Sequence, residues 1–163
     1  RPATRGQTPS SMLRNQLTEN LKTAQKAKDA CAVSTLRLIL AALKDRDIAA
    51  RGKGNADGID EDEILLMLQT MVKQRRESIA LYRKGGREDL AEREEREITI
   101  IEGFLPEQMS EAEIQNSVDA AIAETGASGI KDMGKVMAHL RDAFAGQMDF
   151  ARASGIVKAQ LGQ

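Results

Sequence analysis

The apolar residues of this chain recur every three or four positions from Met12 almost to the C-terminus. This spacing places them along one face of an α-helix, whereas a half-buried strand would alternate apolar and polar residues. Polar or glycine-rich segments interrupt the spacing, most clearly at residues 52–58 and at Gly85 and Gly86. The pattern therefore predicts an all-α protein with no convincing strand.

A domain boundary is expected near Pro106, because proline cannot continue a helix. Residues 12–105 are then predicted to form an N-terminal domain of about four helices. Residues 110–163 are predicted to form a small C-terminal domain of three helices. Residues 1–11 hold two of the three prolines and almost nothing apolar, so we expect a disordered extension or an artificial addition there.

Short polar motifs mark the expected helix starts. Asp60 with Glu63, and Ser110 with Glu113, have the spacing of a capping box, in which side chain and backbone groups satisfy each other. Asp132 is expected to cap the helix that follows it, because a side-chain oxygen there can accept a hydrogen bond from the first helical turn.

The charge and cysteine content limit the classes of function. The sequence has 24 Lys and Arg against 25 Asp and Glu, a formal net charge of -1, so no global field attracts nucleic acid or membrane. One cysteine and one histidine cannot form an internal disulfide or a Cys/His zinc site. No apolar run approaches the roughly 20 residues of a spanning helix. We expect a cytoplasmic protein without metal, cofactor or membrane contact.

Residues 129–136 match most of a nucleotide-binding P-loop. Gly129, Gly134 and Lys135 have the spacing of that motif, but Val136 stands where a hydroxyl should ligate magnesium. The loop also needs a preceding parallel strand, and none is expected. We therefore interpret the segment as a helix start capped by Asp132, at which Gly134 permits close packing.

No catalytic group can be assembled from local sequence. His139 falls on the helix face opposite the apolar residues, and no serine, cysteine or carboxylate is spaced to orient it. Cys31 sits at an expected helix start, a position found for reactive thiols, although a small buried thiol is the commoner case.

Arg75 projects onto the middle of the apolar face of its helix, and Glu94 does the same on the next helix. A charge on a core face is costly unless it is paired. We predict a buried or half-buried ion pair between Arg75 and Glu94, with Glu97 as the alternative partner.

Two groups of basic residues are candidates for binding nucleic acid. The first group is Lys73, Arg76, Arg83, Lys84 and Arg87, and the second is Lys131, Lys135, Arg141, Arg152 and Lys158. A solvated basic face without a ligand is an equally good interpretation of the first group, since the net charge is near zero.

Several motifs in one order resemble the GatB/YqeY family. They are TLRL (35–38), AALK (41–44), VKQRRES (72–78), GREDLA (86–91), FLPEQ (104–108) and KDMGKVM (131–137), with Tyr82, Glu94, Glu97, Ile98, Val157 and Leu161. The resemblance covers roughly residues 12–161 and implies a helical N-terminal domain followed by a three-helix domain. It also implies kinship with the tail of the B subunit of the glutamine-dependent amidotransferase that converts mischarged Glu-tRNA or Asp-tRNA.

In that enzyme the tail is associated with tRNA recognition, and the chemistry resides in other domains. The resemblance therefore favours a binding module for tRNA, or for a tRNA-handling assembly, without its own active site. The family label of carbon-nitrogen ligase with glutamine as amido-N-donor would pass to this chain by relationship alone. Two alternatives stay open: an accessory component of amide transfer, and a protein-interaction adaptor.

Overall fold

A computed structural model describes residues 9–162, with side chains from Met12 onward. The elements are α1 (Pro9–Lys26), α2 (Ala30–Gly52), α3 (Glu61–Lys84), α4 (Glu88–Glu102), α5 (Glu111–Thr125), the 3-10 turn η1 (Ile130–Asp132), α6 (Met133–Phe144) and α7 (Phe150–Leu161). No strand occurs among residues 9–162, so the all-α prediction is confirmed for them. The predicted extension lies mostly outside the described residues, and α1 already begins at Pro9.

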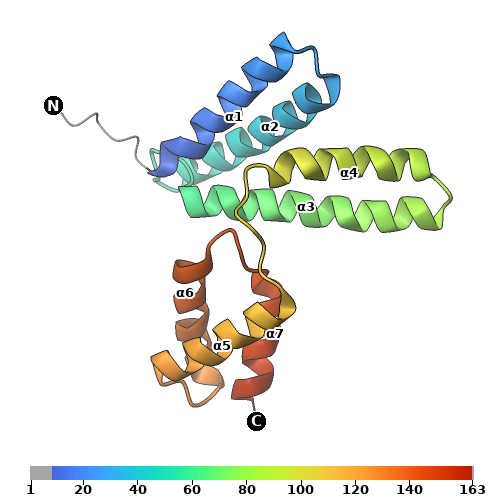
Figure 1. Cartoon of the computed structure of the whole chain (residues 1–163). Helices are drawn as coiled ribbons and strands as arrows, with labels where there is room; N and C mark the ends of the chain where they lie inside the picture. The colour runs from blue at the N-terminus through green and yellow to red at the C-terminus, as the bar shows by residue number, and fades with distance from the viewer. Residues whose placement is uncertain (1–8, 163) are drawn as a thin grey trace. The chain divides into compact units, whose positions relative to one another are not determined.

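The chain divides into two compact units, the N-terminal unit Arg1–Leu105 and the C-terminal unit Pro106–Gln163. Helices α1 to α4 belong to the first unit, and η1 with α5 to α7 belongs to the second (Figure 1). No helix among the described residues combines the length and the apolar character needed to cross a membrane.

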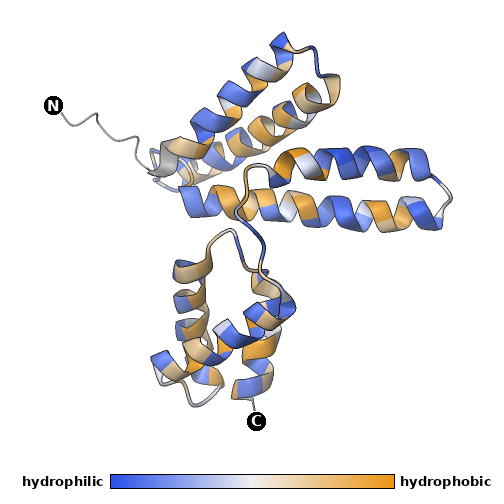
Figure 2. Cartoon of the chain, in the orientation of Figure 1, coloured by the Kyte–Doolittle hydropathy of each residue, from blue (hydrophilic) through white to orange (hydrophobic). Residues whose placement is uncertain are grey.

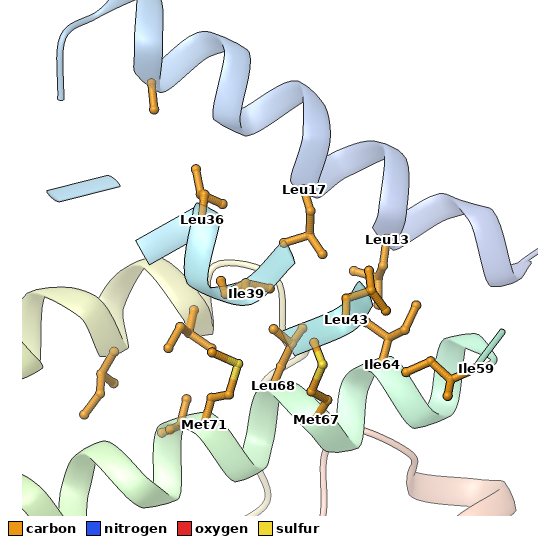
Figure 3. Packing of buried hydrophobic residues seen from close by; sticks show 14 of the residues in the cluster. Leu13, Leu17, Leu36, Ile39, Leu43, Ile59, Ile64, Met67, Leu68 and Met71 are labelled. Carbon is orange, nitrogen blue, oxygen red and sulfur yellow. The ribbon is translucent and has the colours of Figure 1, made fainter. Parts of the chain in front are cut away.

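The N-terminal unit consists of two helical hairpins. Helix α1 packs on α2 and α3 packs on α4, while α2 also contacts both helices of the second hairpin (Figure 1). The core lies where the hairpins meet, and Leu17, Ile39, Ile64 and Leu68 are fully buried in it (Figure 3). Apolar and polar residues alternate along the four helices, as a spacing of three to four residues predicts (Figure 2).

A partly buried ion pair anchors the loop between α2 and α3 to α1. Arg14 Nη2 lies 2.5 Å from Asp47 Oδ1 and donates a second hydrogen bond to the Ile59 carbonyl at 2.9 Å. The same Asp47 oxygen accepts the Ile59 backbone N–H at 2.9 Å. Gly58 lies against this carboxylate with φ +81°, a conformation that a side chain rarely adopts. No local sequence pattern predicts this contact.

The C-terminal unit has its own core, formed where α5, α6 and α7 pack on one another. Val118, Val136, Leu140 and Val157 are fully buried in it. The Ser110 and Glu113 capping box is confirmed, because each residue's side chain bonds the other's backbone N–H. The chain before α5 is also tied down, since the Met109 N–H donates to the Gln147 carbonyl at 2.9 Å.

Candidate functional site

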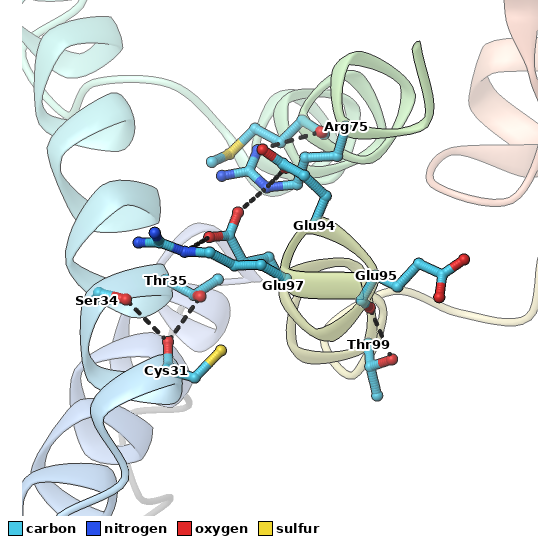
Figure 4. Close-up of polar contacts among 10 residues, drawn as sticks. Cys31, Ser34, Thr35, Arg75, Glu94, Glu95, Glu97 and Thr99 are labelled. Atoms are coloured by element: carbon cyan, nitrogen blue, oxygen red, sulfur yellow. Dashed lines mark hydrogen bonds and ion pairs between the residues drawn. The ribbon is translucent and has the colours of Figure 1, made fainter. Parts of the chain in front are cut away.

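Arg75 is the centre of a half-buried charge network between α3 and α4. Its Nε donates to Glu97 Oε2 at 2.9 Å and lies 3.8 Å from Glu94 Oε2, and its Nη1 donates to the Met71 carbonyl at 3.3 Å (Figure 4). The exposed fractions of the Arg75, Glu97 and Glu94 side chains are 13%, 10% and 22%. The structure thus brings the three residues together, with the shorter contact to Glu97, the alternative partner.

Glu94 and Arg93 complete this network. Burial raises the pKa of Glu94, and the negative charge of Glu97 raises it further, while Arg75 acts in the opposite direction. Arg93 Nε lies 3.8 Å from the second oxygen of Glu97, so Glu97 stands between two guanidinium groups. One cation of α3, Arg75, therefore meets one cation and two carboxylates of α4 in a single network.

A groove runs beside this network, between α2 and the second hairpin. One hollow of about 330 Å³ is lined by Leu38, Tyr82 and the charged network, and a second of about 570 Å³ by Val33, Arg37 and Leu38. Leu38, Arg93 and Glu97 line both hollows, so the two hollows adjoin, and we call them together the groove. Local sequence could not predict the groove. Its walls come from α2 and α4, and the whole of α3 separates these two helices in the sequence.

Three of the predicted nucleic-acid residues in the N-terminal unit are already paired with carboxylates. Arg76 contacts Glu102 at 2.8 Å, Arg83 contacts Glu95 at 2.6 Å and Glu88 at 3.2 Å, and Arg87 contacts Asp89 at 3.2 Å. Lys73 and Lys84 are exposed, and neither forms an ion pair with any residue from Met12 to Gly162. A ligand would have to compete for the arginines, whereas the two lysines are accessible.

The C-terminal unit shows the same division between arginines and lysines. Arg152 contacts Glu111 at 2.8 Å, and the Arg141 guanidinium lies 6.0 Å from the centre of the Phe150 ring. Lys131, Lys135 and Lys158 are exposed, and none has an ion-pair partner among the side chains that the structure describes. Among the described residues of this unit, the accessible positive charge without a carboxylate partner is therefore on these three lysines and on Arg141, which is also exposed.

The segment that resembles a P-loop differs from its predicted form. The 3-10 turn η1 precedes α6, and Asp132 caps no helix with its side chain. Its carboxylate instead accepts the Ser128 N–H at 3.0 Å, which lowers the Asp132 pKa, as do the charges of Lys131 and Lys135. A Cβ added at Gly134 would meet no atom within 4 Å, so the predicted close packing there is wrong.

His139 has a partner that local sequence could not reveal. Its Nε2 lies 2.9 Å from Glu124 Oε2, which joins α6 to α5. Both side chains are substantially exposed. No cluster of three or more His, Cys, Asp or Glu side chains suited to a metal ion occurs within the described part of the chain.

Comparison with known proteins gives relatives named for mitochondria. The protein of Lachancea thermotolerans named "Altered inheritance of mitochondria protein 41, mitochondrial" is 33% identical over 153 residues, which is 89% of this chain and 76% of that protein. The Eremothecium gossypii protein of the same name is 35% identical over 89 residues, 55% of this chain and 46% of its own length. These names contradict the predicted cytoplasmic location, so that prediction is wrong.

Two further findings bear on the family. An uncharacterized protein of Schizosaccharomyces pombe is 31% identical over 100 residues, 61% of this chain and 74% of its own length. The family model described as "Yqey-like protein" matches residues 14–161, which include all the motifs of the N-terminal and C-terminal units. This chain belongs to the Yqey-like protein family.

Proposed function

We propose that this protein is a binding module for tRNA or for a tRNA-handling assembly, with no active site of its own. Under this proposal its two units are domains of four and three helices, and the second is kin to the amidotransferase tail. The observation that supports the proposal is the group of exposed lysines in the C-terminal unit. Lys131 in η1 and Lys135 in the first turn of α6 lie near a helix start, where phosphate groups are favoured, and Lys158 in the last turn of α7 adds positive charge.

Lys131, Lys135 and Lys158, which we call the lysine cluster, belong to η1, α6 and α7 of the C-terminal unit. The Ile130 side chain would lie 3.7 Å from a Cβ added at Gly162, so η1 lies against the end of α7. Lys131 follows Ile130, and the Lys158 carbonyl accepts the Gly162 N–H one helical turn away. Lys135 is one turn beyond Lys131.

Filter binding of tRNA across a salt series tests the proposal. Each phosphate contact contributes about 0.7 to 0.9 to the slope of log affinity against log salt concentration. Replacing the three residues of the lysine cluster by Gln should lower that slope by about 2 and weaken binding at low salt.

A matched control variant removes three positive charges from arginines that are paired with carboxylates. Arg83, Arg87 and Arg152, each bound to a carboxylate, are replaced by Gln together, and tRNA binding should change little. An equal loss in the two triple variants would show a response to net charge alone. Wild-type affinity for tRNA no better than for a polyanion such as heparin would also reject the proposal.

A further inference from the structure

The groove of the N-terminal unit has the features of a site for a small polar ligand. Its first hollow, about 330 Å³ and lined by Tyr82, is at the lower end of the size range of ligand pockets in proteins. Residues from α2, α3 and α4 converge on it, so its walls are set by the packing of three helices rather than by a loop. Leu38 supplies an apolar wall and is 52% exposed, although it is a large aliphatic residue.

The first hollow offers hydrogen-bond donors and acceptors beside an aromatic ring. Gln74 carries an amide donor and acceptor, Ser78 a hydroxyl, and Glu94 a carboxyl group that also interacts with Glu97 and lies 3.8 Å from Arg75. Tyr82 lines the same hollow. A planar heterocycle with amino groups and ring nitrogens suits this set, since it can stack on the ring and bond through its edge.

The adjoining hollow brings positive charge to the same groove. Arg37 lines it and is exposed, with no ion-pair partner among the residues whose side chains are described. Arg93 lines both hollows, and its contact with Glu97 is 3.8 Å long. Guanidinium groups are well suited to phosphate, because they present several N–H donors in one plane.

We propose that the groove between α2, α3 and α4 binds a nucleotide, with the base in the hollow beside Tyr82 and the phosphate at Arg37 and Arg93. The nucleotide is either a free nucleoside monophosphate or one unit of single-stranded RNA, since the chemistry of recognition is the same. In the second case the inference rests on the proposed tRNA binding and adds a specific contact to it. The groove and the lysine cluster belong to different units of the chain.

The test is calorimetric titration of the full chain with AMP, with GMP and with a short unstructured oligoadenylate. Saturable binding of at least one of the three is expected. Tyr82 is the single tyrosine and the chain has no tryptophan, so quenching of tyrosine fluorescence reports occupancy of the groove. Free tyrosine amide corrects for absorption of the exciting light by the nucleotide.

Arg37→Glu should weaken binding at least tenfold, because it removes a phosphate contact and places a negative charge in the groove. Arg46→Glu is the matched control, since Arg46 is exposed on the same helix and lines neither hollow. It should change affinity less than twofold. Equal effects of the two substitutions, or no saturable binding of any probe at millimolar concentration, would overturn the inference.

The oligonucleotide distinguishes the two sources of the nucleotide. Binding of the oligoadenylate at least tenfold tighter than AMP assigns the groove to RNA, and equal or tighter binding of AMP assigns it to a free nucleotide. The proposed function fails separately, because it is judged by tRNA binding of the lysine-cluster variant. A protein that binds tRNA through the lysine cluster but none of the three probes would refute only the groove.

Discussion

Arg75 has two carboxylate neighbours at different distances, and the difference predicts unequal effects on stability. Glu97→Ala removes the hydrogen-bonded partner at 2.9 Å and leaves a half-buried guanidinium, so we expect the free energy of unfolding to fall by about 3 kcal/mol. Glu94→Ala removes a longer contact from a more exposed residue and should cost less than about 1 kcal/mol. Urea denaturation measures both values.

The double variant Arg75→Met with Glu97→Leu is the control for this prediction. Replacing both members of a buried pair by apolar groups is often close to neutral, so it should be more stable than Glu97→Ala. Equal losses in Glu94→Ala and Glu97→Ala would contradict the assignment of Glu97 as the main partner.

Glu94 also predicts a dependence of stability on pH. Its pKa is raised above the ordinary value of 4.5, chiefly by burial, so the folded state holds this proton more tightly than the unfolded state. That contribution is fully present below the unfolded-state pKa and is lost as the pH rises through the folded-state pKa. Glu94→Gln should therefore gain stability relative to wild type between about pH 4 and pH 8, measured by urea midpoints. A constant difference across that range would contradict the raised pKa.

Alanine substitutions at two glycines of the α2–α3 loop would distinguish the cost of backbone strain from the cost of steric overlap. Gly54 and Gly58 both have positive φ, but a Cβ at Gly54 would meet nothing within 4 Å, whereas at Gly58 it would overlap the Asp47 carboxylate. Gly54→Ala should cost about 1 kcal/mol of unfolding free energy through backbone strain alone. Gly58→Ala should cost about 2 kcal/mol more, since it also displaces Asp47 from Ile59. Thermal or urea unfolding measures both variants. Similar losses of unfolding free energy in the two would show that the Asp47 side chain can move aside at little cost.

At the scale of helices, the start of α3 allows the stability contributed by a capping hydrogen bond to be compared with that contributed by charge alone. Asp60 accepts the Glu63 N–H at 2.9 Å, whereas Asp62 lies in the first turn of the same helix. Asp60→Ala should lower the unfolding free energy by about 1 kcal/mol, and Asp62→Ala by only a few tenths through the helix dipole. Urea unfolding compares them, and equal losses would mean that the hydrogen bond contributes nothing beyond charge.

What sequence could predict about these helices follows from the range of the interactions. The caps at Asp60 and Ser110 join residues three apart, and apolar spacing is also local, so the sequence predicts both the caps and the helices. The contacts of Asp47 cannot be predicted in this way, because its partners lie 33 and 12 residues away. The groove beside Arg75 needs α2 and α4 to meet, which no local pattern encodes. Asp132 had the composition of a cap, but the preceding η1 turn redirects its carboxylate to Ser128.

At the scale of the whole molecule, the two units have separate hydrophobic cores. Leu68 is fully buried in the first core and Leu140 in the second. Truncating either to alanine should lower stability by about 2 to 5 kcal/mol, because it leaves a cavity in a packed interior. Since no residue belongs to both cores, we expect each loss to be confined to the unit that carries the substitution.

Hydrogen exchange measured by mass spectrometry decides whether this confinement holds. Leu140→Ala should accelerate amide exchange in peptides from α5, α6 and α7 and leave peptides from α3 and α4 unchanged, and Leu68→Ala should do the reverse. Faster exchange across both units in either variant would show that the chain unfolds as one cooperative body. In that case a substitution in the lysine cluster could also change binding at the groove, and the reverse. The two binding tests would then have to be interpreted together.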